Sequence, residues 1–288
     1  MAETREISVI WLQASTCTGC SVSVLNSASP RITDLLLREV VPGKHVHLRF
    51  QATVMAGAGE PALEVLEAAR AEAGSYLLVI EGSVPTKDGG VYGTLGEAPM
   101  VERVAEMARS AMAVIALGTC ASFGGMFASS PNPAGCTSAG DLLRSEAIDV
   151  PLINVPGCPP HPDWFVGTVA TVLIGGLEAV AVDDVGRPTR FYGQLIHENC
   201  PRRAYFDEGK FAAHLSDEGC LYELGCKGTM THADCSLRRW NSGVNWVIGS
   251  GAPCNGCTEP DFPDLTSPFY ERIPEEALLV PPPPRKES

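Results

Sequence analysis

The sequence predicts an α/β fold built on a parallel sheet, followed by an irregular, cysteine-rich second domain. Two observations lead to this prediction. Over the first two-thirds of the 288 residues, short β-rich runs alternate with amphipathic segments, as a parallel sheet with crossover helices requires. After about residue 183 the chain is instead rich in glycine, cysteine and aromatic residues, and it has few periodic runs.

Five apolar runs are predicted to be strands, and helical patterns lie between and after them. The predicted strands are residues 7–12, 46–50, 76–81, 113–117 and 152–155. The predicted helices are residues 32–40, 61–73, 100–110, 139–147 and 163–174. The second of these helices has Pro61 in its first turn, with Glu64 and Glu67 near its positive end. Together these elements predict five βα units and a flavodoxin-like or Rossmann-like sheet.

A domain boundary is predicted near residue 185, where Asp-Asp-Val-Gly-Arg-Pro at 183–188 is typical of a turn. Residues 1–185 would form the flavodoxin-like α/β domain and residues 186–288 the cysteine-rich domain. The last eight residues, 281–288, comprise four prolines and then Arg-Lys-Glu-Ser, which predicts an extended tail lying over a surface.

Charge and hydropathy exclude several classes of partner. With 21 basic and 34 acidic side chains the net charge is −13, which disfavours binding to nucleic acid and to anionic membrane surfaces. The longest apolar run, residues 164–177, contains three glycines and is shorter than the roughly 20 residues of a transmembrane helix. No signal peptide is evident, so we expect a cytoplasmic protein, or a periplasmic one if an export leader has been removed or is supplied by a partner.

The 11 cysteines indicate metal binding more than disulfide bonding. Disulfide frameworks are typical of small secreted domains without a sufficient core, whereas this chain has ample apolar residues for one. Clustered thiols in a reducing compartment more often bind metal.

A first set of four thiols follows predicted strands. Cys17 and Cys20 follow the first strand, Cys120 the fourth and Cys158 the fifth. Open α/β sheets bind ligands at the carboxyl ends of their strands, so we expect these thiols to meet at one metal site. Cys120 and Cys158 could alternatively be small buried residues. Their positions in glycine- and proline-rich turns favour the metal site.

Two further sets lie in the cysteine-rich domain. One can close a four-ligand site and comprises His197, Cys200, Cys220 and Cys226. The other has only three thiols, Cys235, Cys254 and Cys257. Structural zinc is almost always four-coordinate, whereas a three-iron cluster needs only three thiolates. Sets of four, four and three therefore favour two [4Fe-4S] clusters and one [3Fe-4S] cluster, with zinc at all or some of the sites as the alternative.

Several segments along the chain carry a family resemblance. They are Trp-Leu-Gln at 11–13, Cys-Thr-Gly-Cys-Ser-Val at 17–22, Glu-Gly-Ser-Val-Pro at 81–85, Gly-Thr-Cys-Ala at 118–121, Pro-Gly-Cys-Pro-Pro-His-Pro-Asp-Trp at 156–164, His-Glu-Asn-Cys-Pro at 197–201, Gly-Cys-Lys-Gly at 225–228 and Glu-Pro-Asp-Phe-Pro at 259–263. In these segments the sequence closely resembles the small subunit of nickel–iron hydrogenases, including the nickel–iron–selenium branch.

The resemblance implies an electron-transfer role without catalytic residues in this chain. The first thiol set would hold a proximal cluster facing a Ni-Fe centre on a separate large subunit. The three-thiol set would hold the medial cluster, and the set with His197 the distal one. Dihydrogen would be split on the partner, and electrons would pass singly to an external acceptor such as a cytochrome or a ferredoxin.

The resemblance also refines individual positions. Val247 stands where the selenium branch has a fourth medial cysteine, which again implies a three-iron centre. Gly19 and Gly125 stand where some oxygen-tolerant members have extra proximal cysteines, so that route to oxygen tolerance is not supported. Cys136 usually has no ligand role in the family and is interpreted as a partly buried free thiol, with a redox role near the proximal cluster as the alternative. His161 and Asp163, beside Cys158, are interpreted as structural, with support of the proximal cluster as the alternative.

Three rival functions remain open from the sequence. A hydrogen-sensing complex of the same family would contain the same row of clusters. A zinc-stabilised scaffold protein would use the same thiols without electron transfer. An electron-transfer subunit of another assembly, such as the related complex I subunit, would lack the cysteine-rich second domain.

Overall fold

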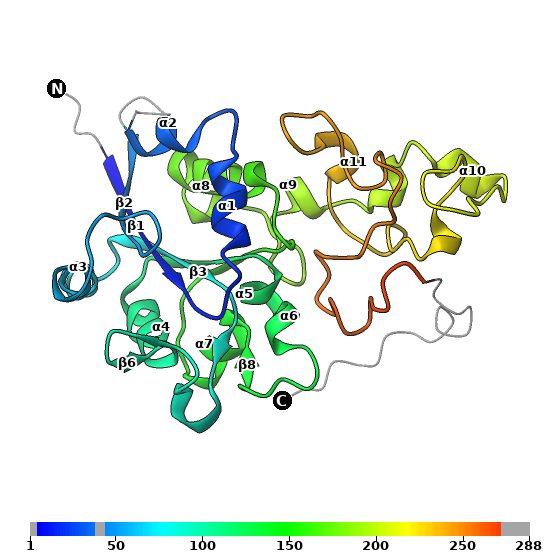
Figure 1. The fold of residues 1–288 in the computed structure, drawn as a ribbon. Coiled ribbons are helices and arrows are strands. Elements are labelled where there is room, and N and C mark those ends of the chain that lie inside the picture. The colour runs from blue at the N-terminus through cyan, green and yellow to red at the C-terminus, as the bar shows by residue number, and fades with distance from the viewer. Residues whose placement is uncertain (1–4, 38–43, 272–288) are drawn as a thin grey trace.

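A five-stranded parallel sheet forms the centre of the first part of the chain. The structure, a computed structural model, describes residues 5–37 and 44–271. The strands are β1 (Arg5–Gln13), β2 (Lys44–Gln51), β3 (Tyr76–Glu81), β7 (Ala113–Leu117) and β9 (Leu152–Val155). Their order in the sheet is β2-β1-β3-β7-β9 (Figure 1), which is the 2-1-3-4-5 order of flavodoxin-like sheets. The predicted fold class is confirmed, and β3, β7 and β9 have the predicted bounds.

The order of the strands reverses at β1, because β2 pairs with one edge of this strand and β3 with the other. In open α/β sheets, ligands bind beyond the carboxyl ends of the strands at such a reversal. The chain leaves β1 at Gln13 and reaches Cys17 four residues later. The topology therefore directs this cysteine toward the edge of the sheet at which a ligand is expected.

Helices cover both faces of the sheet (Figure 1), so most strand side chains are buried. One face is covered by α1 (Gly19–Leu25) and α8 (Pro162–Gly175), the other by α3 (Glu60–Ala71), α4 (Met100–Ser110) and α7 (Ala139–Ser145). Trp11 packs with Trp164 and Phe165 in the core of the first face. Leu66 packs with Leu78 in the core of the second.

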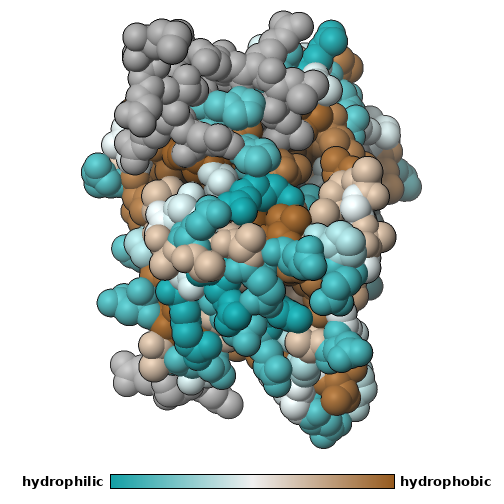
Figure 2. All heavy atoms as spheres, turned by 90° about the vertical axis from the view of Figure 1, so that its left-hand side faces the viewer, coloured by the Kyte–Doolittle hydropathy of each residue, from teal (hydrophilic) through white to brown (hydrophobic). Residues whose placement is uncertain are grey.

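Helix α3 illustrates how the sequence pattern produces these layers. Ala62, Leu66 and Ala69 recur at helical spacing and are buried, whereas Glu64 and Glu67 are exposed. Hydrophilic side chains are spread over the side of the molecule on which α3 lies (Figure 2). The helix predicted at residues 32–40 begins as expected, as α2 (Ile32–Leu37), and its predicted end lies outside the described residues.

Several short elements have no periodic pattern in the sequence and were not predicted. In the first part of the chain they are α1, α5 (Thr119–Phe123), α6 (Gly125–Ala128), β4 (Val84–Pro85), β5 (Thr94–Leu95), β6 (Ala98–Pro99), β8 (Cys136–Thr137), η1 (Lys87–Gly90) and η2 (Leu177–Ala179). Two of these short helices, α1 and α5, contain Cys20 and Cys120 respectively.

The later part of the chain is mostly irregular, as predicted, and its elements lie to one side of the sheet (Figure 1). They are α9 (Thr189–Tyr192), η3 (Ile196–Asn199), α10 (Arg203–Asp207), η4 (Tyr222–Leu224) and α11 (Cys235–Arg238). One hydrophobic core joins Trp164 beside the sheet to Leu221 and Ile248 in this part. The domain boundary near residue 185 stays a prediction.

Two other expectations concern the ends and surfaces of the chain. The turn expected at 183–188 is present, since the Gly186 N–H donates to the Asp183 carbonyl at 2.9 Å. The tail expected at 281–288 lies outside the described residues.

Within residues 5–37 and 44–271, no helix combines the length and the apolar character needed to cross a membrane.

The buried position of Leu66 leads to a stability prediction. This side chain is 1% exposed, so Leu66→Ala should leave a cavity and lower the free energy of unfolding by about 2–5 kcal/mol. The same substitution at Leu265, which is 55% exposed, should change it by no more than about 0.5 kcal/mol. Urea denaturation of both variants measures the difference. Equal effects would contradict the assigned core.

Candidate metal centres

The first thiol set meets at the carboxyl end of the sheet. Cys17 follows β1, Cys20 lies in α1, Cys120 lies in α5 directly after β7, and Cys158 follows β9. Burial raises the pKa of the Cys20 thiol, and the negative charges of Glu81 and of the other three thiols raise it further. Each thiol is thus close enough to act electrostatically on Cys20. Cys17 and Cys158 are exposed, so the set reaches the surface.

Two glycines allow the strand-end loops to approach these thiols. Gly118 has φ 86°, and a side chain there would collide with the Cys20 sulfur. Gly157 has φ 139°, and a Cβ there would lie 2.6 Å from the Pro160 Cα. The turns before Cys120 and Cys158 therefore need glycine for both conformation and space.

A buried carboxylate lies beside this set and was not predicted as a functional residue. Glu81 ends β3 and is 0% exposed. It accepts hydrogen bonds from Trp11 Nε1 at 2.9 Å, Gln13 Nε2 at 3.3 Å, Thr16 Oγ1 at 3.2 Å and the Ser21 N–H at 3.1 Å, and also from the Ser21 hydroxyl. The available signal was an acidic residue closing an otherwise apolar strand, Tyr-Leu-Leu-Val-Ile-Glu.

All four members of the second set line one pocket. They are His197, Cys200, Cys220 and Cys226. Burial lowers the pKa of His197, and the nearby Arg203 lowers it further. Burial raises the pKa of Cys200, to which the charge of Cys220 also contributes. The neutral form of the imidazole is the protonation state in which histidine binds metal.

The third set is the most deeply buried. Burial raises the pKa of Cys254, and the charges of Cys226, Cys257 and Cys235 add to this effect. Burial likewise raises the pKa of Cys235, with Cys257 as the next cause. The three thiols therefore act on one another, although Cys235 and Cys254 are separated by 18 residues in the sequence.

The third set lies between the other two in space, although it comes last in the sequence. Burial raises the pKa of Cys257, and a hydrogen bond from the backbone N–H of Cys158 in the first set opposes the rise. On the other side, the Cys254 N–H donates to the Cys226 sulfur of the second set at 3.4 Å. The three sets consequently form a row.

The thiol sets of the described residues do not have the arrangement of a single-ion site. Among the residues that the structure describes, no three His, Cys, Asp or Glu side chains are arranged to bind one metal ion. Ligands of a polynuclear cluster are held farther apart, because each binds a different iron. The sulfur-rich donor sets also suit iron–sulfur clusters. The donor chemistry of the three sets therefore fits iron–sulfur clusters.

Cys136 lies near the first set without joining it. It is 7% exposed, and its sulfur is 3.9 Å from the Ser15 hydroxyl. Its backbone N–H donates to Asn132 Oδ1 at 2.7 Å, and the Asn132 amide donates back to the Cys136 carbonyl at 2.9 Å. These contacts fit the expected buried free thiol.

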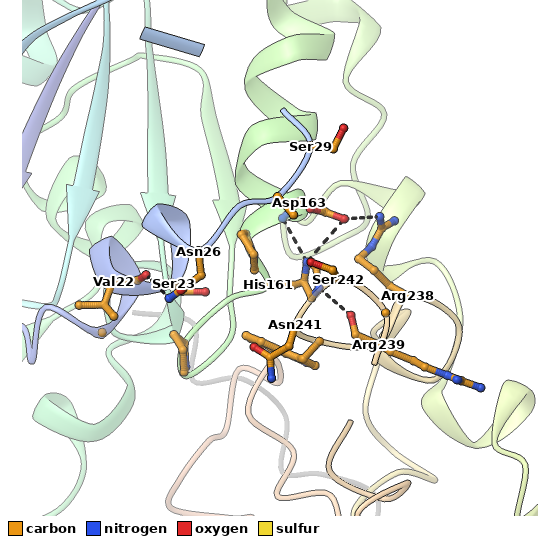
Figure 3. A pocket seen from close by; sticks show the side chains of 16 residues that line it. Val22, Ser23, Asn26, Ser29, His161, Asp163, Arg238, Arg239, Asn241 and Ser242 are labelled. Atoms are coloured by element: carbon orange, nitrogen blue, oxygen red, sulfur yellow. Dashed lines mark hydrogen bonds and ion pairs between the residues drawn. The ribbon is translucent and has the colours of Figure 1, made fainter. Parts of the chain in front are cut away.

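His161 and Asp163 make contacts that support the structural interpretation. His161 is 5% exposed and caps α8, because its Nδ1 accepts from the Asp163 N–H at 3.1 Å. The His161 Nε2 lies 2.7 Å from the Arg239 carbonyl, and Asp163 accepts from Arg238 at 3.1 Å (Figure 3). Both side chains line a cavity of about 690 Å³ between α1 and residues 238–243.

Two family models match consecutive parts of the chain. Residues 17–172 match the model of the NADH ubiquinone oxidoreductase, 20 Kd subunit. Residues 192–270 match the model of the C-terminal part of the NiFe/NiFeSe hydrogenase small subunit. The second match separates this chain from the complex I subunit, which was expected to lack a cysteine-rich second domain.

Individual relatives resemble nearly the whole chain. The periplasmic [NiFeSe] hydrogenase small subunit of Desulfomicrobium baculatum is 43% identical over 282 residues, covering 92% of this chain and 87% of the relative. The periplasmic [NiFe] hydrogenase small subunit of Solidesulfovibrio fructosivorans is 42% identical over 270 residues, covering 92% of this chain and 82% of the relative.

Solved structures agree with these relatives. The recombinant [NiFeSe] hydrogenase from Desulfovibrio vulgaris Hildenborough has a chain with a TM-score of 0.87 and 47% identity, covering 92% of this chain and 98% of that one. A chain of the actinobacterial-type NiFe-hydrogenase from Ralstonia eutropha H16 has a TM-score of 0.86 and 30% identity, covering 96% of this chain and 86% of that one. The chain belongs to the small subunits of NiFe/NiFeSe hydrogenases, and is therefore part of an oxidoreductase complex with a separate large subunit.

Proposed function

We propose that this chain conducts single electrons between the Ni-Fe centre of the large subunit and an external acceptor, through three iron–sulfur clusters. The observation that carries the proposal is the row of three thiol sets. Cys17 and Cys158 of the first set are exposed, and the apolar side chain of Val22, two residues after Cys20 in α1, is 54% exposed. That surface suits a protein partner at one end of the row.

The proposal assigns one cluster to each set. The proximal [4Fe-4S] cluster would be held by Cys17, Cys20, Cys120 and Cys158. The distal [4Fe-4S] cluster would be held by His197, Cys200, Cys220 and Cys226. The medial [3Fe-4S] cluster would be held by Cys235, Cys254 and Cys257. These assignments rest on the mutual electrostatic effects and hydrogen bonds within and between the sets.

The chain's own residues would bind the clusters, exclude water from them and adjust their electronic properties. When bound, iron–sulfur clusters supply reversible one-electron transfer. Backbone N–H groups of Cys158 and Cys254 donate to thiols of neighbouring sets, and such hydrogen bonds stabilise negative charge on sulfur. Cys254 is 4% exposed, which keeps water from the middle of the row.

His197 gives the distal set a different charge from the proximal one. A neutral imidazole in place of a thiolate removes one negative charge, which raises a cluster's reduction potential. Burial and Arg203 both lower the pKa of His197, so the neutral form is favoured at pH 7. This arrangement suits delivery of electrons outward, to an acceptor such as a cytochrome or a ferredoxin.

We further propose a periplasmic location for the complex. The two relatives compared above are periplasmic hydrogenase subunits by name. The cytoplasmic location expected from the sequence has no support among the relatives, whereas the periplasmic alternative has. An export leader or an exported partner would supply the transport.

Elemental analysis of the complex, purified anaerobically from its native host, tests the assignment of metals. We expect about 12 irons per copy of this chain, from clusters of four, four and three irons plus one at the active site, together with about one nickel. Zinc in place of iron would contradict the proposal and favour the scaffold alternative. Iron without nickel would contradict the hydrogenase assignment.

Replacement of a proximal ligand should separate this chain's role from that of the partner. Cys17→Ser should disrupt the proximal cluster and abolish hydrogen-dependent dye reduction, because electrons could no longer leave the large subunit. Iron content per complex should fall by about four. Cys136→Ser is the matched control and should retain both iron and activity. Full activity in Cys17→Ser would disprove the ligand assignment.

Replacement of the distal histidine should affect only the outer end of the row. His197→Gly should slow dye reduction by removing a distal ligand, while hydrogen isotope exchange at the large subunit stays largely intact. His214→Gly is the control, because that side chain is 84% exposed and lies outside the three sets. Equal loss of exchange and dye reduction in His197→Gly would refute a distal role.

A further inference from the structure

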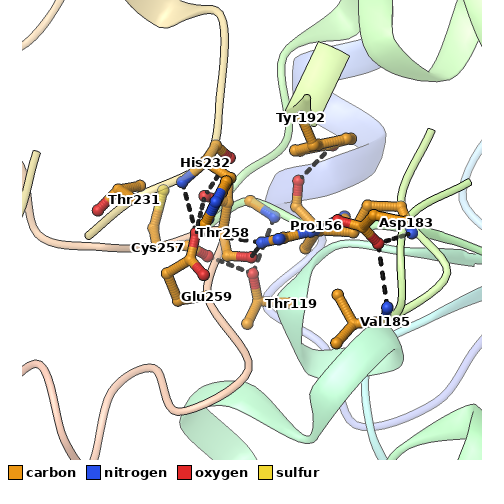
Figure 4. Close-up of polar contacts among 12 residues, drawn as sticks. Thr119, Pro156, Asp183, Val185, Tyr192, Thr231, His232, Cys257, Thr258 and Glu259 are labelled. Carbon is orange, nitrogen blue, oxygen red and sulfur yellow. Dashed lines mark hydrogen bonds and ion pairs between the residues drawn. The ribbon is translucent and has the colours of Figure 1, made fainter. Parts of the chain in front are cut away.

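A buried network of charged side chains lies next to the segment that carries Cys257 of the third thiol set. Arg187 is 5% exposed and Glu259 is 9% exposed. The Arg187 Nη1 donates to Glu259 Oε1 and to the Thr258 carbonyl, both at 3.1 Å, and its Nε donates to Asp183 Oδ2 at 2.8 Å. Asp183 and Glu259 lie on opposite sides of this network in Figure 4.

The network connects the sheet to the segment that carries Cys257. The turn before Arg187 is fixed to β9, because the Asn154 N–H donates to the Gly186 carbonyl at 2.8 Å. The Asn154 amide also donates to the Val185 carbonyl at 2.8 Å. Glu259 comes two residues after Cys257. The guanidinium therefore joins the strand that leads to the proximal set with the segment that follows a medial thiol.

A second, uncharged link holds the same segment. The Thr119 hydroxyl donates to the Cys257 carbonyl and accepts from the Gly157 N–H at 2.8 Å (Figure 4). Thr119 is next to Cys120 of the proximal set. The Cys257 segment is thus attached to the proximal loops through a neutral hydroxyl and to β9 through a buried ion pair.

The charges of the network act on the same buried space as the medial thiols. Burial raises the pKa of Tyr192, whose ring lies 5.8 Å from the Arg187 guanidinium carbon. The charges of Cys235 and Cys257 raise this pKa further, and that of Arg187 lowers it. One buried cation therefore balances two carboxylates close to the medial site.

We propose that Arg187 is a positioning residue for the medial cluster. Together with Glu259, Arg187 fixes the Cys257 segment against β9. Its positive charge also offsets the negative charges of Glu259 and Asp183 near the medial cluster, which would hold the transferred electron. This inference rests on the proposed function. Without the Arg187 cation, the negative charges of Glu259 and Asp183, left with backbone N–H donors such as that of His232, would oppose the arrival of an electron at the medial cluster.

The test is a redox titration of the three-iron signal by electron paramagnetic resonance on the whole complex. Arg187→Met should lower the medial midpoint potential, because two carboxylates lose their cation. Glu259→Gln should raise it, because one carboxylate charge is removed. The double variant should have a midpoint between those of the two single variants. Shifts of opposite sign distinguish a charge effect from a general disturbance of the fold.

The outcomes that overturn the inference are specific. Unchanged midpoints, or shifts of the same sign in both single variants, refute it. If Arg187→Met does not assemble, Glu259→Gln alone decides by its upward shift or lack of one. Arg144→Met, at a side chain 72% exposed, should leave the midpoint unchanged. An unaltered complex without a three-iron signal contradicts the cluster assignment itself, whereas a normal signal with unshifted midpoints contradicts only the role of Arg187.

Discussion

The crowding of cysteine thiols into a few small groups is the constraint on which the rest of this molecule depends. Ten of the 11 cysteines belong to three groups, and neighbouring thiols add to the raised pKa values of Cys20, Cys235 and Cys254. A thiol must lose its proton to bind iron, yet burial and neighbouring charges both oppose that loss. In the proposed complex, bound metal cations would reverse the balance, so cluster binding would be coupled to folding of the surrounding loops. The irregular second part, with short helices such as α10 and α11, would depend most on this coupling.

The sheet holds the loops of the first set in place, so their structure would depend less on cluster binding. Cys17, Cys120 and Cys158 follow strands whose order and spacing are fixed by backbone pairing in β1, β7 and β9. The other two sets lie in loops and short helices, away from the sheet and its backbone pairing. Their positions are held instead by the shared core around Trp246 and Ile248, and by single contacts such as the Lys227 N–H donating to the Cys254 carbonyl at 2.8 Å. Stability is therefore distributed unevenly along the row.

Sequence patterns were sufficient for the sheet and insufficient for the relation between the sets. Strands β3 and β7 are buried on both faces and form continuous apolar runs, so their bounds could be predicted. Helix α1 has only seven residues and begins at Gly19, which leaves too little periodicity to detect. Spacing alone did not indicate that Cys235 and Cys254 lie between sets that precede them in the sequence; only the family resemblance implied it. The Arg187–Glu259 pair joins residues 72 apart, and no local pattern identifies it.

Backbone amides connect each thiol set to the next, and this has a consequence for electron transfer. Cys158 and Cys257 belong to different sets, yet the backbone N–H of Cys158 donates a hydrogen bond to the Cys257 sulfur. The same relation holds between Cys254 and the Cys226 sulfur. Each hydrogen bond fixes the distance between neighbouring sets and stabilises charge on the accepting sulfur. With clusters bound, adding an electron at one site would therefore act directly on a ligand residue of the next. If the proposed clusters are bound, the third set, linked in this way on both sides, is where a change in local charge would have the widest effect along the row.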